Sequence, residues 1–84
     1  MNRKNRISEI LKKKLINFDV VLEDDSYKHR HHNNFDGKGE THFSVILKNK
    51  NNEKINRLAT HRLINHLLKE EFKQGLHALE IRIT

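Results

Sequence analysis

Hydrophobic and polar positions at the start of the chain alternate with the period of a helix. The hydrophobic residues three or four positions apart are Ile7, Ile10, Leu11 and Leu15. Lysines fill the positions between the last two of them, as expected for a solvated helix face. The spacing predicts an amphipathic helix that Asn5 caps and that stops near Asn17.

Two later stretches alternate with the period of a strand. In residues 18–23 the side chains of Phe18, Val20 and Leu22 fall on one face, and in residues 41–47 Phe43, Val45 and Leu47 do the same. Both stretches are rich in β-branched residues. We expect them to pair as an antiparallel hairpin.

The segment that joins these strands, residues 27–40, is rich in His, Asn and Gly and has no hydrophobic period. Asp36-Gly37 is a turn signal within it. Loops of about a dozen residues in a compact domain are usually functional or disordered. The pattern therefore predicts a long loop between the two strands.

Helical spacing resumes at Ile55 and continues to Phe72. Thr60 could cap a second helix inside this stretch, so we expect a short helix followed by a longer one, with Gly75 as the stop. Residues 76–83 then alternate as a last strand, with His77 on its hydrophobic face.

The predicted order is helix, strand, strand, helix, helix, strand, within one domain of 84 residues. The clean alternation of the strands predicts an α+β fold in which helices cover one face of a three-stranded sheet. With no cysteine, neither a disulfide nor a thiolate metal ligand is available. No stretch is long and apolar enough for a membrane span or a secretory signal, so we expect a cytoplasmic protein.

Four segments, in this order along the chain, resemble the BolA family. They are Glu23-Asp24-Asp25-Ser26-Tyr27-Lys28-His29, Gly39-Glu40-Thr41-His42-Phe43-Ser44-Val45, His61-Arg62-Leu63-Ile64-Asn65 and Leu76-His77-Ala78-Leu79-Glu80-Ile81. Two features depart from the family pattern: polar residues 49–56 replace a Phe-x-Gly motif, and Thr60 replaces the first Arg of an Arg-His-Arg motif.

The resemblance implies a domain similar to a class II K-homology fold that works with a monothiol glutaredoxin. It also implies that the two proteins share a [2Fe–2S] cluster, with His77 as the invariant ligand of this chain and a loop histidine as the second. His31 and His32 are nearest the family position, and His29 is a further possibility. A structural interpretation of His77 is that it orders the corner between helix and strand.

Two imidazoles leave a [2Fe–2S] site incomplete, since each iron needs two ligands besides its sulfides. Because this chain has no thiolate, the remaining ligands must come from outside. In the family they would be a glutaredoxin cysteine and the thiol of glutathione. The strand pattern places His42 on the face opposite Phe43, and we interpret it as a structural or supporting residue.

A net charge of +6 favours nucleic acid as an alternative partner. The family resemblance also implies a DNA-binding transcriptional regulator of stress response or morphology, for which Arg57, His61 and Arg62 would form the contact surface. His61 and Arg62 are equally interpretable as a local cap network at the helix start. Against DNA or RNA binding, the three glycines cannot form the Gly-x-x-Gly loop with which K-homology domains hold phosphates. No metalloprotease, phosphate-loop or nucleophile-elbow motif occurs, so we expect no enzymatic activity.

Overall fold

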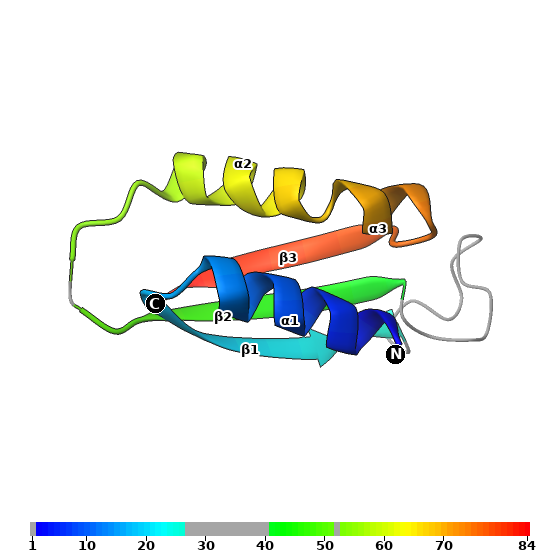
Figure 1. Ribbon diagram of the computed structural model, residues 1–84, viewed down its shortest axis with the longest axis horizontal. Coiled ribbons are helices and arrows are strands. Elements are labelled where there is room, and N and C mark those ends of the chain that lie inside the picture. The colour runs from blue at the N-terminus through cyan, green and yellow to red at the C-terminus, as the bar shows by residue number, and fades with distance from the viewer. Residues whose placement is uncertain (1, 27–40, 52) are drawn as a thin grey trace.

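The computed structural model describes residues 2–26, 41–51 and 53–84. Its elements are α1 (Arg3–Lys14), β1 (Phe18–Asp24), β2 (His42–Asn49), α2 (Arg57–Leu67), α3 (Lys69–Lys73) and β3 (Ala78–Ile83) (Figure 1). The predicted order of helices and strands is therefore confirmed. None of the helices in these ranges has the length and apolar character needed to cross a bilayer.

The three strands form one mixed sheet in the order β1-β2-β3. β1 and β2 are antiparallel, as predicted, with Phe18 opposite Asn49 and Asp24 opposite Phe43. β2 and β3 are parallel, with His42 opposite Ala78. Parallel neighbours need a long crossover connection, and α2 with α3 supplies it.

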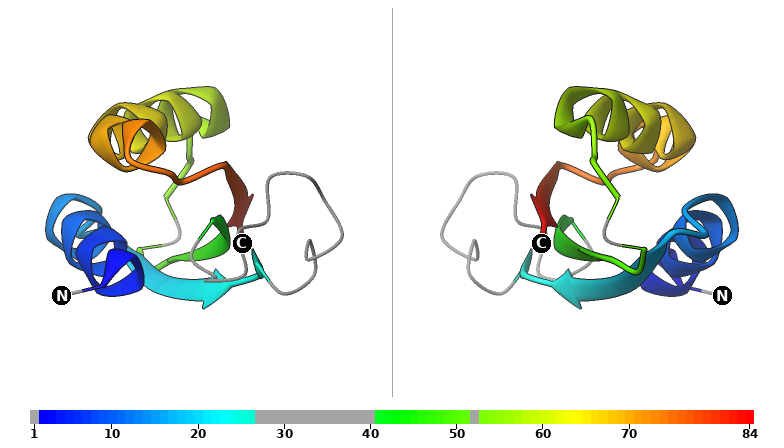
Figure 2. Two further views of the ribbon diagram at one scale, coloured as in Figure 1. Left: turned by 90° about the vertical axis from the view of Figure 1, so that its right-hand side faces the viewer. Right: turned by 90° about the vertical axis from the view of Figure 1, so that its left-hand side faces the viewer.

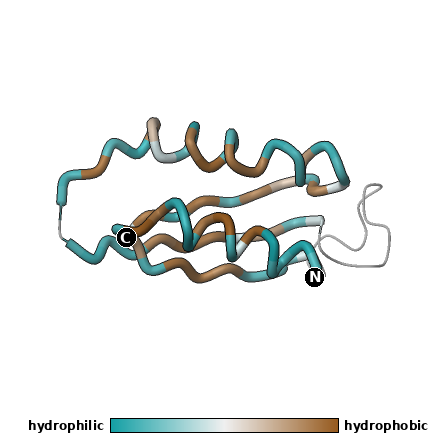
Figure 3. Tube along the Cα trace, viewed as in Figure 1, coloured by the Kyte–Doolittle hydropathy of each residue, from teal (hydrophilic) through white to brown (hydrophobic). Residues whose placement is uncertain are grey.

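Both helical layers lie on the same face of the sheet, as the end-on views show (Figure 2). The fully buried side chains of the core come from α1, α2 and the inner face of β2, together with the residue that follows α2. They are Ile7, Leu11, Val45, Leu47, Ile64 and Leu68, with Phe43 at 2% exposure. Hydrophobic residues run along the strands and alternate with hydrophilic ones along the helices (Figure 3). β1 and β3 are buried on one face, as their alternation predicted, whereas β2 also buries His42 and Ser44 on its other face.

The first helix begins earlier than the sequence suggested. Asn2, not Asn5, is its cap: the Asn2 side-chain oxygen accepts a hydrogen bond from the Asn5 amide at 2.8 Å. Asparagine is a good cap at either position, and the helix extends to the earlier one because this bond satisfies an amide that would otherwise lack a partner. The helix ends at Lys14, before Asn17.

The prediction of a short helix followed by a longer one was wrong, since the longer helix comes first. Asn56 caps α2 by accepting the Ala59 amide at 3.0 Å. The Thr60 hydroxyl donates to the Asn56 carbonyl one turn back, a bond compatible with a helix interior. The break falls instead at Leu68, which separates α2 from the five-residue α3.

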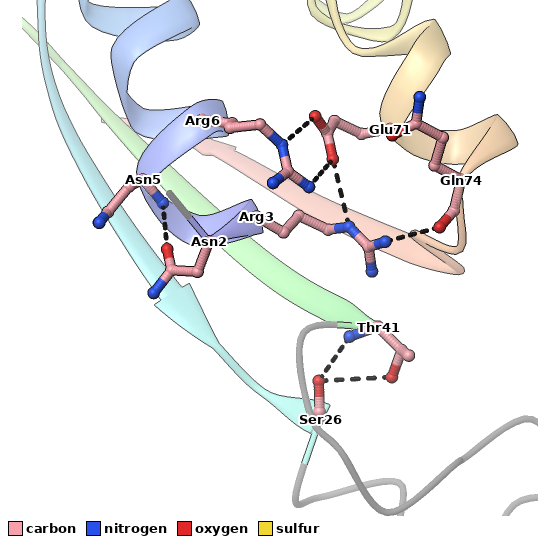
Figure 4. A network of polar contacts seen from close by, with 8 residues as sticks. All are labelled: Asn2, Arg3, Asn5, Arg6, Ser26, Thr41, Glu71 and Gln74. Carbon is pink, nitrogen blue, oxygen red and sulfur yellow. Dashed lines mark hydrogen bonds and ion pairs between the residues drawn. The ribbon is translucent and has the colours of Figure 1, made fainter.

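A partly buried ion-pair cluster joins α1 to α3 (Figure 4). The Glu71 carboxylate, whose side chain is 8% exposed, accepts from Arg6 Nε at 2.9 Å and from Arg3 Nε at 3.2 Å. Arg3 also donates to the Gln74 carbonyl at 2.7 Å. The Arg6 hydrogen bond, against the opposing effect of burial, holds the pKa of Glu71 below its usual value of 4.5, and Coulombic attraction from both arginines adds to it.

Gly75 has the left-handed backbone conformation predicted for the residue that stops the helix, with φ of 119°. A Cβ atom at this position would also lie 3.1 Å from Arg3 Nη2. The glycine therefore serves both the turn into β3 and the close approach of Arg3.

Replacing Glu71 with Gln should destabilise the fold, because both arginines lose their carboxylate partner in a mostly buried position. We expect a loss of about 1.5–3 kcal/mol in the free energy of unfolding, the typical value of hydrogen bonds to charged groups. Urea denaturation would measure it. The matched control is Glu70→Gln, since Glu70 is 63% exposed and has only a surface pair with Lys73. Equal stabilities of the two variants would contradict a structural role for Glu71.

The same carboxylate should make stability depend on pH in acid. Its pKa is lower in the folded chain than the 4.5 of an unfolded one, so its contribution is complete above pH 4.5 and is lost as pH falls through the folded value. We expect the difference in stability between the wild type and Glu71→Gln to shrink steadily below about pH 4.5. Denaturation series at several pH values would show it, and a difference that grows in acid would contradict it.

Candidate functional site

The candidate site lies where β2 and β3 begin, at the end of the sheet where residues 26 and 41 meet. The Thr41 carbonyl accepts two hydrogen bonds, from the His77 amide at 2.7 Å and the Ala78 amide at 3.1 Å. These bonds fix the backbone of the loop that leaves α3. The His77 side chain is exposed at this corner.

His42 is the neighbour of His77. Their ring centroids are 5.1 Å apart, with the ring planes tilted by 56°. His42 is 5% exposed, and its Nδ1 lies 2.9 Å from the Thr41 hydroxyl oxygen. The strand pattern predicted that His42 and Phe43 lie on opposite faces of the sheet. It could not predict that His42 lies beside His77, because that proximity arises from the parallel register of β2 and β3.

Ser26 joins the two ends of the segment between β1 and β2 (Figure 4). Its hydroxyl donates to Asp24 Oδ1 at 2.6 Å and accepts from the backbone amides of Thr41 at 2.8 Å and His42 at 3.1 Å. The side chain is 1% exposed. Sequence analysis missed this residue, although the Asp-Asp-Ser sequence after a strand was a signal for a local side-chain turn.

A shallow hollow of about 220 Å³ opens beside His42, between Asp25 and Glu80. Asp25 accepts a hydrogen bond from Ser44 at its rim. Pockets for small-molecule substrates usually measure about 300–1,000 Å³. The surface near the histidines thus suits contact with a partner better than it suits an enclosed substrate.

The described residues offer only part of a metal site. Neutral imidazoles are ligands for iron, zinc and copper, so the exposed His77 fits such a role. Residues 2–26, 41–51 and 53–84 contain no group of three side chains able to hold a metal ion together. The other two predicted ligands, His31 and His32, lie outside the described residues, as does His29. A metal centre at His77 would therefore need ligands from elsewhere.

The structure does not gather the predicted surface of Arg57, His61 and Arg62 on one side of α2. Arg57 Nη1 donates to the Ile83 carbonyl at 3.1 Å, and His61 is half-buried one turn later. Arg62 is exposed, about 140° further round the helix than Arg57. Arg57 thus helps hold α2 against β3, and Arg62 faces solvent.

Comparison with known proteins extends the likeness to almost the whole chain. The sequence profile of the family described as BolA-like protein matches residues 4–84. Protein BOLA1, chloroplastic, of Arabidopsis thaliana is 45% identical over 82 residues, which are 95% of this chain and 51% of that protein. The UV-induced protein uvi31 of Schizosaccharomyces pombe is 42% identical over 84 residues, which are 96% of this chain and 82% of that protein. The chain thus spans about half the length of the first relative.

Solved structures agree with the sequence relatives. The BolA domain of SufE1 from Arabidopsis thaliana superposes with a TM-score of 0.80 at 38% identity, covering 100% of this chain and 92% of that one. BolA1 from the same plant gives 0.79 at 42% identity, covering 99% and 90%. Both likenesses extend through α1, the sheet and the helical crossover. The chain therefore belongs to the BolA-like protein family.

Proposed function

We propose that this protein is a non-enzymatic adaptor that pairs with a monothiol glutaredoxin and shares a [2Fe–2S] cluster with it. The observation that carries the proposal is the exposed imidazole of His77, held beside the buried ring of His42 in a chain without cysteine. Membership of the BolA-like family supports a regulatory role of this kind. The BolA domain of SufE1 is a structural neighbour that supports it further.

The ligand count explains why a partner is required. His77 would offer one imidazole from the end of the sheet, and we propose His32 or His31, on sequence grounds alone, for the second. The glutaredoxin cysteine and the glutathione thiol would supply sulfur. Mixed imidazole and thiolate ligation raises the potential of a [2Fe–2S] cluster, which suits transfer or sensing. The corner fixed by Thr41 keeps the His77 backbone in place while its side chain faces the partner.

Replacing His77 with Ala should abolish the spectrum of the shared cluster while the fold survives. The His77 side chain is exposed, and its backbone bond to Thr41 does not need the imidazole, so the free energy of unfolding should change by no more than about 0.5 kcal/mol. Visible absorption and circular dichroism of the protein mixed with a cluster-loaded monothiol glutaredoxin and glutathione would measure the loss. The matched control is His66→Ala, since His66 is an exposed histidine on α2.

An unchanged cluster spectrum with His77→Ala would remove His77 as a ligand. Absence of any complex between the wild type and the glutaredoxin would remove the adaptor function as a whole. The variants His31→Ala and His32→Ala, measured in the same way, would assign the second ligand.

Nucleic-acid binding is a second candidate, favoured by the net charge of +6 and by the exposed Arg62. If Arg62 contacts a phosphate, Arg62→Gln should weaken binding and reduce the slope of log affinity against log salt by about 1. Fluorescence anisotropy with labelled DNA and RNA at several salt concentrations would measure the slope. Arg82→Gln is the control, since Arg82 is also exposed but pairs with Glu80 at 2.9 Å. No binding at about 50 mM salt would exclude this function.

A further inference from the structure

We infer that His42 is a positioning residue for His77, and that the hydroxyl groups of Ser26 and Thr41 fix the tautomer of His42. The importance of this arrangement for a bound cluster rests on the proposed function. The tautomer of His42 and the orientation of the two rings are independent of the proposed function, because they follow from hydrogen bonds within the chain.

The hydrogen-bonding capacity of Ser26 is full. A hydroxyl group has one hydrogen to donate and two lone pairs to accept with. The hydrogen goes to Asp24 Oδ1 at 2.6 Å, and the lone pairs accept the amides of Thr41 and His42 at 2.8 and 3.1 Å. Ser26 therefore cannot accept a further bond from the Thr41 hydroxyl.

The hydrogen of the Thr41 hydroxyl is thus directed to His42. Its oxygen lies 3.4 Å from Ser26 Oγ, which is long for a bond between hydroxyl groups, and 2.9 Å from His42 Nδ1. With Thr41 as the donor, His42 Nδ1 is an acceptor and carries no proton. A neutral imidazole then has its proton on Nε2. The fully used Ser26 hydroxyl and the neighbouring Thr41 hydroxyl together select this one tautomer.

The same contacts hold the His42 ring in place. Its backbone amide donates to Ser26, its carbonyl accepts from the Asp25 amide at 2.7 Å, and its ring is fixed through Nδ1. The ring forms a rigid wall 5.1 Å from that of His77, centre to centre. Because the His77 backbone is fixed by Thr41 at 2.7 Å, the wall limits which rotamers the exposed imidazole can adopt. His42 thereby orients the candidate ligand.

Thr41→Val tests the inference, since valine keeps the shape and the backbone bonds of threonine and removes only the hydroxyl. In the free wild type, nitrogen–proton correlation spectra of the imidazoles should show His42 protonated at Nε2 alone, and scalar couplings should show one χ1 rotamer for His77. In Thr41→Val we expect mixed tautomers of His42 and averaged couplings of His77. Thr41→Ser should restore the single tautomer and the single rotamer of the wild type. Thr60→Val is the control, because the Thr60 hydroxyl donates to the Asn56 carbonyl at the start of α2, away from the two histidines.

The second measurement links this arrangement to the cluster. Loss of supporting contacts around metal-binding histidines typically costs about 10–100-fold in affinity. We expect the affinity for the cluster shared with the glutaredoxin to be at least about 10-fold lower in Thr41→Val than in Thr60→Val, as measured by titrating the visible spectrum of the cluster.

A wild-type His42 protonated at Nδ1 would overturn the tautomer, and unchanged His77 couplings in Thr41→Val would overturn the positioning role. If Thr41→Val fails to fold, the wild-type spectra still decide the tautomer of His42. The positioning role is then decided by measuring the His77 couplings in His42→Gln, where unchanged couplings would overturn it. A wild type that takes up no cluster would instead refute the proposed function, whatever the spectra of the free protein show.

Discussion

The architecture depends on the parallel pairing of β2 with β3. Its first bonds are those that the Thr41 carbonyl accepts from His77 and Ala78. Strands that run in the same direction cannot be joined by a tight turn, so the pairing requires the α2–α3 crossover and places that crossover on one face of the sheet. The position of the helices, the buried core and the adjacent histidines all follow from this register.

Polar residues at the end of the sheet are buried with their hydrogen-bonding groups paired. In the described ranges, no buried side-chain nitrogen or oxygen lacks a hydrogen-bond partner. Ser26 and Thr41 are almost inaccessible, yet the hydroxyl group of each has hydrogen-bond partners. Such satisfied networks specify one arrangement, since any alternative leaves a polar group unpaired in a medium of low dielectric constant. A rigid base for His77 results.

Local patterns in the sequence predicted the elements and the buried faces of the strands, since alternation depends only on neighbouring residues. The errors arose where the local sequence offered two alternatives of similar stability. Asn2 and Asn5 are equally good caps, and Thr60 can cap a helix or bond within one. The supporting role of His42 was predicted, but its contact with His77 was not, and neither was the role of Glu71. Each depends on a residue distant in sequence, His77 and Arg6, whose proximity only the complete fold establishes.

The ion-pair cluster between α1 and α3 has a consequence for protein synthesis. Arg3 and Arg6 are made before Glu71, which lies 68 and 65 positions later. During translation α1 can form early, because its bonds are local, but its arginines have no carboxylate from α3 until almost the whole domain has left the ribosome. The ion pairs between α1 and α3 are therefore a late event, formed after α1 and the neighbouring β1 are both available to pack together.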